Sequence, residues 1–211
     1  MSKKKDYIIT SDKFLTRQER SKILKVARER AELDQLKGRI TWPIRYMLVD
    51  LALFSGLRVA EIAALKIGDI HLDTKDPHIF VRNGKGGKSR DVYIDTPLAQ
   101  HLKTFIKEKK TVYRQPAGSD DPLFTGQKGH VPTVTLQKSA KRAIEEAGLP
   151  SHYSIHSFRH TFATFLLSGS GSLRHVKNQL GHSNIAMTSV YAGILPEDNS
   201  RLANMMDRGG I

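Results

Sequence analysis

Apolar residues recur every three or four positions along most of the chain, which is the spacing that gives a helix one buried face. Two short stretches alternate apolar and polar residues instead, and the turn-forming segment Asn83–Gly87 joins them. This predicts a β-hairpin with a basic tip. Its expected inward side chains are Ile79, Val81, Val92 and Ile94. The predicted helices cover about 16–33, 42–55, 58 onward, 96–110, 133–147, 156 onward, 173–180 and 197–207.

Several helix boundaries are marked by residues that favour helix ends. Thr16 and Glu19 fit a capping box, and Gly56 follows a predicted helix end. Thr96 is expected to cap the helix that it begins, with Pro97 at the first helical position. The helix near His156 is expected to use Ser157 as a cap-like residue and to bury the stripe Phe158, Phe162, Phe165 and Leu166. A short extended piece is expected at 122–124.

The net charge narrows the class of partner. The chain of 211 residues carries a formal charge of +13, which favours a polyanion, with nucleic acid ahead of an anionic membrane because no amphipathic anchor stands out. The chain has no cysteine, so disulfides and thiolate metal sites are excluded. No run of eighteen apolar residues occurs, and the lysine-rich start lacks a following apolar segment. We therefore expect a soluble, cytoplasmic protein.

Candidate chemistry gathers between residues 151 and 193. His156 and Arg159 are three apart and share a helix face, close to backbone amides that favour an anion at a helix start. Gly181 fits a helix stop, His182 follows it, and Tyr191 lies nine residues further on. Together these residues predict a phosphate site with its own nucleophile.

Four motifs in order resemble the catalytic domain of the tyrosine recombinases and phage-type integrases. The segment SGLRVAEIAALKIGDI, with Arg58, is similar to the first arginine box of that family, and NGKGGKSRDVYI, with Lys85, is similar to its hairpin lysine. HSFRHTFAT resembles the HxxR box, and LGHSNIAMTSVYAG resembles the LGH box with the nucleophilic tyrosine. The resemblance covers residues 15–193. It implies an α+β fold, namely a mostly helical single domain with a small antiparallel β-hairpin or three-stranded sheet.

The resemblance also implies a mechanism and a set of site residues. Tyr191 would attack the scissile phosphate to form a 3′-phosphotyrosyl link and release a 5′-hydroxyl, so that neither ATP nor a metal is required. The other implied roles are phosphate clamping by Arg58 and Arg159, protonation of the leaving oxygen by Lys85, acid/base assistance by His156, a phosphate hydrogen bond from His182, and support of Arg58 by Glu61.

The expected organisation has three parts. Residues 1–14 form a flexible basic tail, residues 15–194 the catalytic domain, and residues 195–211 a C-terminal helix or tail that is either exchanged between protomers or folded back in cis. The N-terminal core-binding domain of most family members is expected to be absent, either because the recombinase is naturally short or because this is an excised domain. The expected partner is double-stranded DNA, with a monomer in solution and a tetramer on DNA, accessory DNA-bending or directionality proteins, no membrane, and nucleoid association when bound.

Other interpretations of the same residues remain open at the level of sequence. Residues 173–191 fit a helix-turn-helix, which would make the chain a non-catalytic DNA-binding regulator, and a type IB topoisomerase would use a similar set of residues. Arg58 and Glu61 fit an ordinary surface ion pair. His152, His156 and His160 have the spacing of a helical metal site with His182 as a fourth ligand, but no carboxylate accompanies them. A nucleotide-binding loop is excluded, because the glycines near Lys85 fit neither phosphate-loop spacing.

Overall fold

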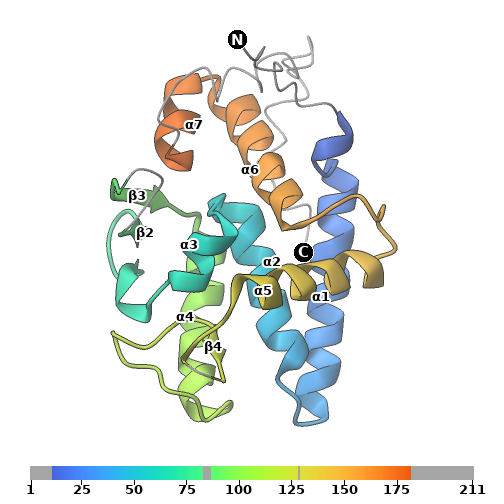
Figure 1. Cartoon of the computed structure of the whole chain (residues 1–211), viewed down its shortest axis with the longest axis vertical. Helices are drawn as coiled ribbons and strands as arrows, with labels where there is room; N and C mark the ends of the chain where they lie inside the picture. The colour runs from blue at the N-terminus through green and yellow to red at the C-terminus, as the bar shows by residue number, and fades with distance from the viewer. Residues whose placement is uncertain (1–10, 83–86, 128, 182–211) are drawn as a thin grey trace, which may run out of the picture.

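A computed structural model describes residues 11–82, 87–127 and 129–181. The described part of the chain is mostly helical, with a small antiparallel sheet at one side (Figure 1). This confirms the predicted fold class. The helices are α1 (Arg17–Leu36), α2 (Thr41–Ser55), α3 (Val59–Ala64), α4 (Thr96–Thr111), α5 (Thr133–Glu146), α6 (Ile155–Ser170) and α7 (Leu173–Leu180), with 3-10 turns η1 (Ser11–Lys13) and η2 (Ile67–Asp69). The strands are β1 (Ile70–His71), β2 (His78–Val81), β3 (Arg90–Tyr93), β4 (Thr125–Gly126) and β5 (Gly129–His130).

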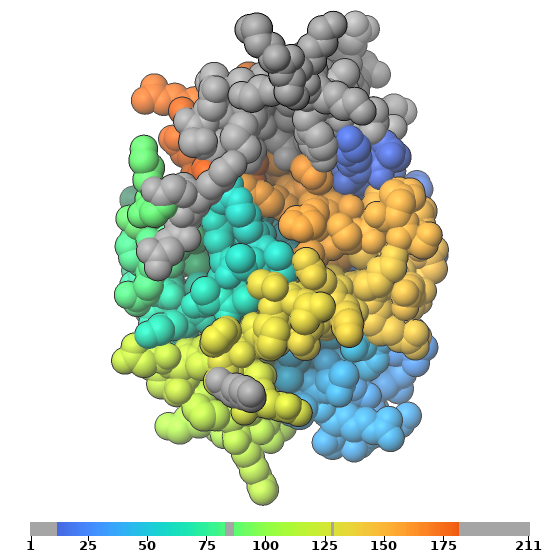
Figure 2. Space-filling view, in the orientation of Figure 1, coloured from blue at the N-terminus to red at the C-terminus, as the bar shows by residue number. Residues whose placement is uncertain are grey.

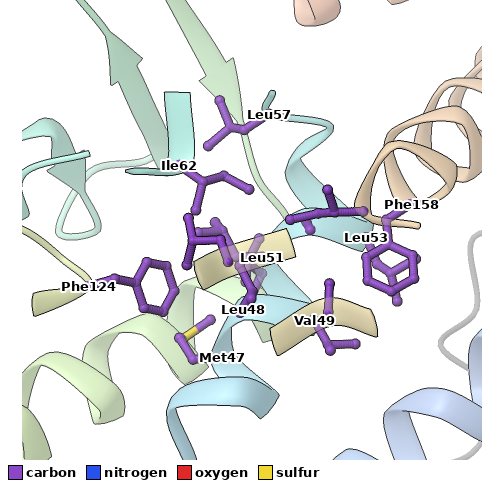
Figure 3. Close-up of a cluster of buried hydrophobic side chains, with 14 of the residues drawn as sticks. Met47, Leu48, Val49, Leu51, Leu53, Leu57, Ile62, Phe124 and Phe158 are labelled. Atoms are coloured by element: carbon purple, nitrogen blue, oxygen red, sulfur yellow. The ribbon is translucent and has the colours of Figure 1, made fainter. Parts of the chain in front are cut away.

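Helix α2 is the centre of the core. Its residues from Met47 to Leu53 are all buried, and it packs against α1, α4, α5 and α6. In Figure 3, side chains of α2 lie between Phe124 on one side and Phe158 of α6 on the other. A helix segment that is buried on every side is stable only when other elements surround it. The rigid core therefore fixes the position of the turn that follows α2.

That turn leads directly to Arg58. Gly56 ends α2 in the left-handed region, with φ 63°, and Arg58 is the residue before the first turn of α3. A side chain at position 56 would meet the ring of Phe162 from α6 at 2.3 Å, so the close approach of α6 also requires glycine. The end of α2, the start of α3 and the middle of α6 are thus held together.

The three-stranded sheet has the order β1-β2-β3, and its pairs are antiparallel. Ile79 lies opposite Val92, and the four residues predicted to point inward are all buried, which confirms the hairpin pattern. The backbone amide of Tyr93 donates a hydrogen bond of 3.1 Å to the side-chain oxygen of Gln179 from α7. The outer edge of β3 is therefore covered by the end of α7.

Two of the predicted caps are wrong. Asp95, not Thr96, caps α4 by accepting from the backbone amide of Leu98 at 2.9 Å, so Pro97 is at the second helical position. Ser154 is the N-cap of α6, and Ser157 is a residue of its first turn whose hydroxyl accepts from the Ser154 amide. In both helices the first turn begins one or more residues earlier than predicted, because an extended residue with a polar side chain precedes it.

The predicted stripe of α6 is only partly buried. Phe158 and Phe165 are buried, as expected. Phe162 and Leu166 are half-buried and line a hollow of about 310 Å³ with Phe54 of α2. Both side chains pack against the smaller apolar cluster of α6 and α7 and not in the central core.

The connection from α4 to α5 pairs with the segment after α3. Lys66 forms an antiparallel bridge with Pro122, and the Leu123 amide donates to the Leu65 carbonyl at 2.8 Å. The extended piece expected at 122–124 therefore exists, and the two-residue strand β4 follows it. Among the described residues, no helix is long and apolar enough to cross a membrane.

Candidate active site

Arg58 and Glu61 form the first part of the candidate site. Glu61 is in the first turn of α3, and its Oε2 accepts from the Arg58 backbone amide at 2.8 Å while its Oε1 accepts from Arg58 Nη1 at 2.8 Å. The Glu61 side chain is 6% exposed and that of Arg58 is 24% exposed. An ordinary surface ion pair is fully solvated and contributes little to the free energy of folding. Because Glu61 is buried, this pair is not an ordinary surface ion pair.

Sequence reasoning missed a second arginine that binds the same carboxylate. Arg90, at the start of β3, donates from Nη1 to Glu61 Oε1 and from Nη2 to Glu61 Oε2, each at 2.9 Å, and its side chain is 11% exposed. Burial alone would raise the pKa of Glu61, but the hydrogen bonds and charges of Arg90 and Arg58 hold this pKa below its usual value. Glu61 is thus an ionised carboxylate between two guanidinium groups. No spacing rule joins two residues that meet only through folding, so the sequence carried no signal for this contact.

Arg159 reaches the same region from α6. It is 8% exposed, and its guanidinium donates to the Gly56 carbonyl and, from Nη2, to the Leu180 carbonyl at 2.8 Å. Arg58 Nη2 lies 3.4 Å from the carbonyl of the next residue, Gly181. The last carbonyls of a helix lack partners within that helix, so they are natural acceptors. The two arginines therefore meet at the end of α7, one residue before His182.

Gly181 is in the left-handed region, with φ 63°, and ends α7. A Cβ at this position would lie 2.9 Å from Cδ, Nε and Nη1 of Arg90. Both the backbone conformation and this contact require glycine. The predicted helix stop at Gly181 is confirmed, and the contact with Arg90 gives it a second cause.

The histidines of α6 differ in environment. His156 is exposed on the first turn and borders a hollow of about 400 Å³ together with Lys138 and Lys141 of α5. Burial, followed by the positive charges of Arg159, His156 and Lys13, lowers the pKa of His160 to about 4. His160 is therefore neutral at neutral pH. His156 and Arg159 both lie close enough to His160 to act on its charge.

A larger hollow of about 490 Å³ lies beside Arg58, between α3, η2 and β2. Its charged lining consists of the cations Arg58, Lys66 and Arg82 and the carboxylates Glu61 and Asp69. Arg82 donates from Nε to Asp69 at 2.5 Å, and the Asp69 side chain is 3% exposed. In Figure 2, the surface of the α3 region (teal) lies between that of the hairpin strands (green) and that of α5 (yellow).

The structure thus brings Arg58, Glu61 and Arg159 together, and it places His156 on the same helix as Arg159. Lys85, His182 and Tyr191 lie outside the described residues, as do the second helix of the helix-turn-helix interpretation and the segments 1–10 and 195–211. Within 11–82, 87–127 and 129–181, no three acidic or histidine side chains gather as a metal site.

Solved recombinases share this fold. The XerH site-specific recombinase bound to palindromic difH substrate, in a post-cleavage complex, superposes with a TM-score of 0.73 and 27% identity over 92% of this chain and 53% of that chain. The XerA recombinase superposes with a TM-score of 0.71 and 25% identity over 95% of this chain and 65% of that chain. The fold and the site therefore place the chain in the class of proteins with a recombinase catalytic domain.

The sequence model of the phage integrase family matches residues 13–197, and the chain belongs to this family. Tyrosine recombinase XerC of Bradyrhizobium diazoefficiens is 33% identical over 181 residues, which is 83% of this chain and 54% of the relative. XerC of Chromobacterium violaceum is 33% identical over 189 residues, which is 88% of this chain and 59% of the relative. The chain spans about half the length of the curated relatives that it matches.

Proposed function

We propose that this chain carries the catalytic part of a site-specific DNA recombinase that cuts and rejoins DNA strands through a 3′-phosphotyrosyl intermediate, without metal or ATP. One observation carries the proposal. Arg58 of α3 and Arg159 of α6 both donate to the last carbonyls of α7, immediately before His182. The membership of the phage integrase family and the XerC relatives support the same activity.

The two arginines would clamp the scissile phosphate. A guanidinium offers several donors in a rigid fork that matches phosphate oxygens, and Arg58 and Arg159 approach from different helices. Glu61 and the carbonyls of Gly56 and Leu180 hold these groups before any substrate binds. Donors that are already oriented stabilise the charge that develops in the transition state without further rearrangement.

Three residues of the proposed reaction, Lys85, His182 and Tyr191, lie outside the described ranges. The Tyr191 oxygen would attack the phosphorus as its proton passes to His156, and the bond to the 5′ oxygen would break while Lys85 gives the leaving oxygen its proton. His156 would assist as acid/base and His182 would donate to a phosphate oxygen. Because the tyrosyl link keeps the ester, the 5′-hydroxyl of a second strand can reverse the step without an energy source.

The partner would be double-stranded DNA. The charge of +13 supports this choice, and the related XerH structure contains its difH substrate. We further propose that residues 15–194 form the catalytic domain, that the chain is a monomer in solution and a tetramer on DNA, and that residues 195–211 pack between protomers. A purely DNA-binding role for residues 173–191 would need none of the buried bonds around Glu61.

A trap for the covalent intermediate tests the activity. A library of nicked duplexes with randomised sequence is incubated with the protein, and DNA that becomes protein-linked is recovered and sequenced. The recovered duplex should give a protease-sensitive adduct that forms in excess chelator and is absent with Tyr191→Phe. An adduct that persists in Tyr191→Phe would exclude the proposed nucleophile, and no adduct with any duplex would exclude the activity.

A further inference from the structure

Arg90 occupies a position in the site that the proposed chemistry does not use. It belongs to β3, whereas Glu61 belongs to α3 and Gln179 and Gly181 to the end of α7. Its two terminal nitrogens bind both oxygens of Glu61, and its Nε donates to the Gln179 carbonyl at 3.0 Å. A single side chain therefore joins the sheet, the helix start that carries Arg58 and the helix end that precedes His182.

The bonds to Glu61 determine how firmly Arg58 is held. Each carboxylate oxygen has two lone pairs, and each accepts one bond from Arg90 and one from Arg58. All four acceptor positions are therefore filled, and Arg58 uses only Nη1 of its guanidinium on Glu61. Without Arg90, Glu61 would be free to take a second side-chain bond from Arg58 in the two-bond pairing that carboxylates and guanidinium groups favour. That pairing would direct Arg58 away from a phosphate.

The bonds to α7 place the end of that helix. The stem of Arg90 packs so closely on Gly181 that a Cβ there would lie at 2.9 Å, and the neighbouring Tyr93 amide is bound by Gln179. The same stretch, Leu180–Gly181, accepts from Arg159 and Arg58. Movement of Arg90 would therefore move the carbonyls that accept hydrogen bonds from Arg159 and Arg58.

We infer that Arg90 is a positioning residue for phosphate transfer. It fills the acceptor positions of Glu61, so that Arg58 keeps donors for the phosphate, and it fixes the end of α7 beside Arg58. This inference rests on the proposed strand-cleaving function. Arg90 itself makes no contact with DNA in this account. Its effect should therefore fall on the rate of cleavage and not on the affinity for DNA.

A double-mutant cycle tests the inference with the nicked duplex recovered by the trap. The rate constant of adduct formation at saturating DNA is measured for the wild type, Arg90→Met, Arg58→Ala and the double variant. Loss of one oriented donor typically lowers such a rate about 100-fold or more. We expect Arg90→Met to lose at least about 10-fold in the wild-type background and a clearly smaller factor in the Arg58→Ala background, where only its effect through the end of α7 remains, because residues that act through one another are not additive. The dissociation constant for the duplex should change by less than about twofold.

The matched control is Arg30→Met, which removes an arginine–glutamate pair between α1 and α5, away from the site. It should cleave at the wild-type rate, and far-UV circular dichroism and thermal unfolding show whether each variant is folded. If Arg90→Met does not fold, Arg90→Lys, which keeps the charge but not the fork, takes its place in the cycle. Cleavage by the Arg90 variant at the wild-type rate, or equal losses in both backgrounds, overturns the inference while the wild-type adduct preserves the proposed function. Absence of a wild-type adduct overturns both.

Discussion

Two glycines with the same backbone conformation have different surroundings. Gly181 and Gly171 end α7 and α6 with φ of 63° and 61°, but only Gly181 has another side chain, that of Arg90, against the position of a Cβ. Alanine at either position should cost about 1 kcal/mol for the left-handed conformation. Gly181→Ala should cost more and should also slow adduct formation, because it displaces Arg90. Chemical denaturation and the cleavage assay check this, and equal effects of the two substitutions would contradict it.

The half-buried His160 should make the free energy of unfolding depend on pH. The pKa of its imidazole is lowered from 6.5 to about 4, so the unfolded chain binds a proton near pH 6.5 that the folded chain binds only near pH 4. The contribution of His160 to stability is therefore fully present above pH 6.5 and is lost as pH falls from 6.5 towards 4. As pH falls from 6.5 to 4, the urea midpoint of the His160→Gln variant should fall by less than that of the wild type. Parallel curves for the two proteins would show that His160 does not titrate in this way.

At the scale of residues, a side-chain contact could be predicted from the sequence where the two partners are close in the chain. Arg58 and Glu61 are three apart at a helix start, and their contact could be expected from this spacing. Arg90 meets Glu61 only because β3 and α3 fold against each other, and a strand residue in isolation gives no such indication. The burial that separates Glu61 from a surface pair also depends on tertiary packing.

Among the elements, the contact between α7 and β3 carries a prediction of its own. Gln179 is 5% exposed, and its side-chain oxygen accepts from the Tyr93 amide at the edge of the sheet. Gln179→Leu should leave this amide without a protein acceptor and raise its hydrogen-exchange rate about fivefold, which corresponds to a bond worth about 1 kcal/mol. The Ile79 amide, within β2, is the internal reference. Unchanged exchange at Tyr93 would show that α7 does not protect the strand.

The elements themselves were largely predictable, because periodicity depends only on local sequence. The helices over α1, α2, α4 and α5 and the inward residues of the hairpin were predicted within a few positions. Errors occurred at helix starts, where Asp95 and Ser154 compete with neighbouring polar residues for the cap. The partial exposure of Phe162 was not predictable, because it depends on how α6 crosses the end of α2.

For the whole molecule, the charge predicts how DNA binding responds to salt. A chain with a formal charge of +13 that neutralises several phosphates should bind duplex DNA with an affinity that falls steeply, with a slope of about −0.9 per phosphate on logarithmic axes. Fluorescence anisotropy over a range of salt concentrations measures this slope. Arg82→Gln should make it shallower by about one if Arg82, in the hollow beside Arg58, contacts a phosphate. An affinity that hardly depends on salt would contradict backbone-dominated binding.

Arg58 and Arg159, brought together at the end of α7, are proposed to act on one phosphate. The most direct measurement is the single-turnover rate of adduct formation at saturating DNA for Arg58→Ala and Arg159→Ala, with Arg30→Ala as the control. Each of the two site variants should lose about 100-fold or more, while the control keeps the wild-type rate. A folded variant of either arginine that cleaves within about twofold of the wild type would contradict the account.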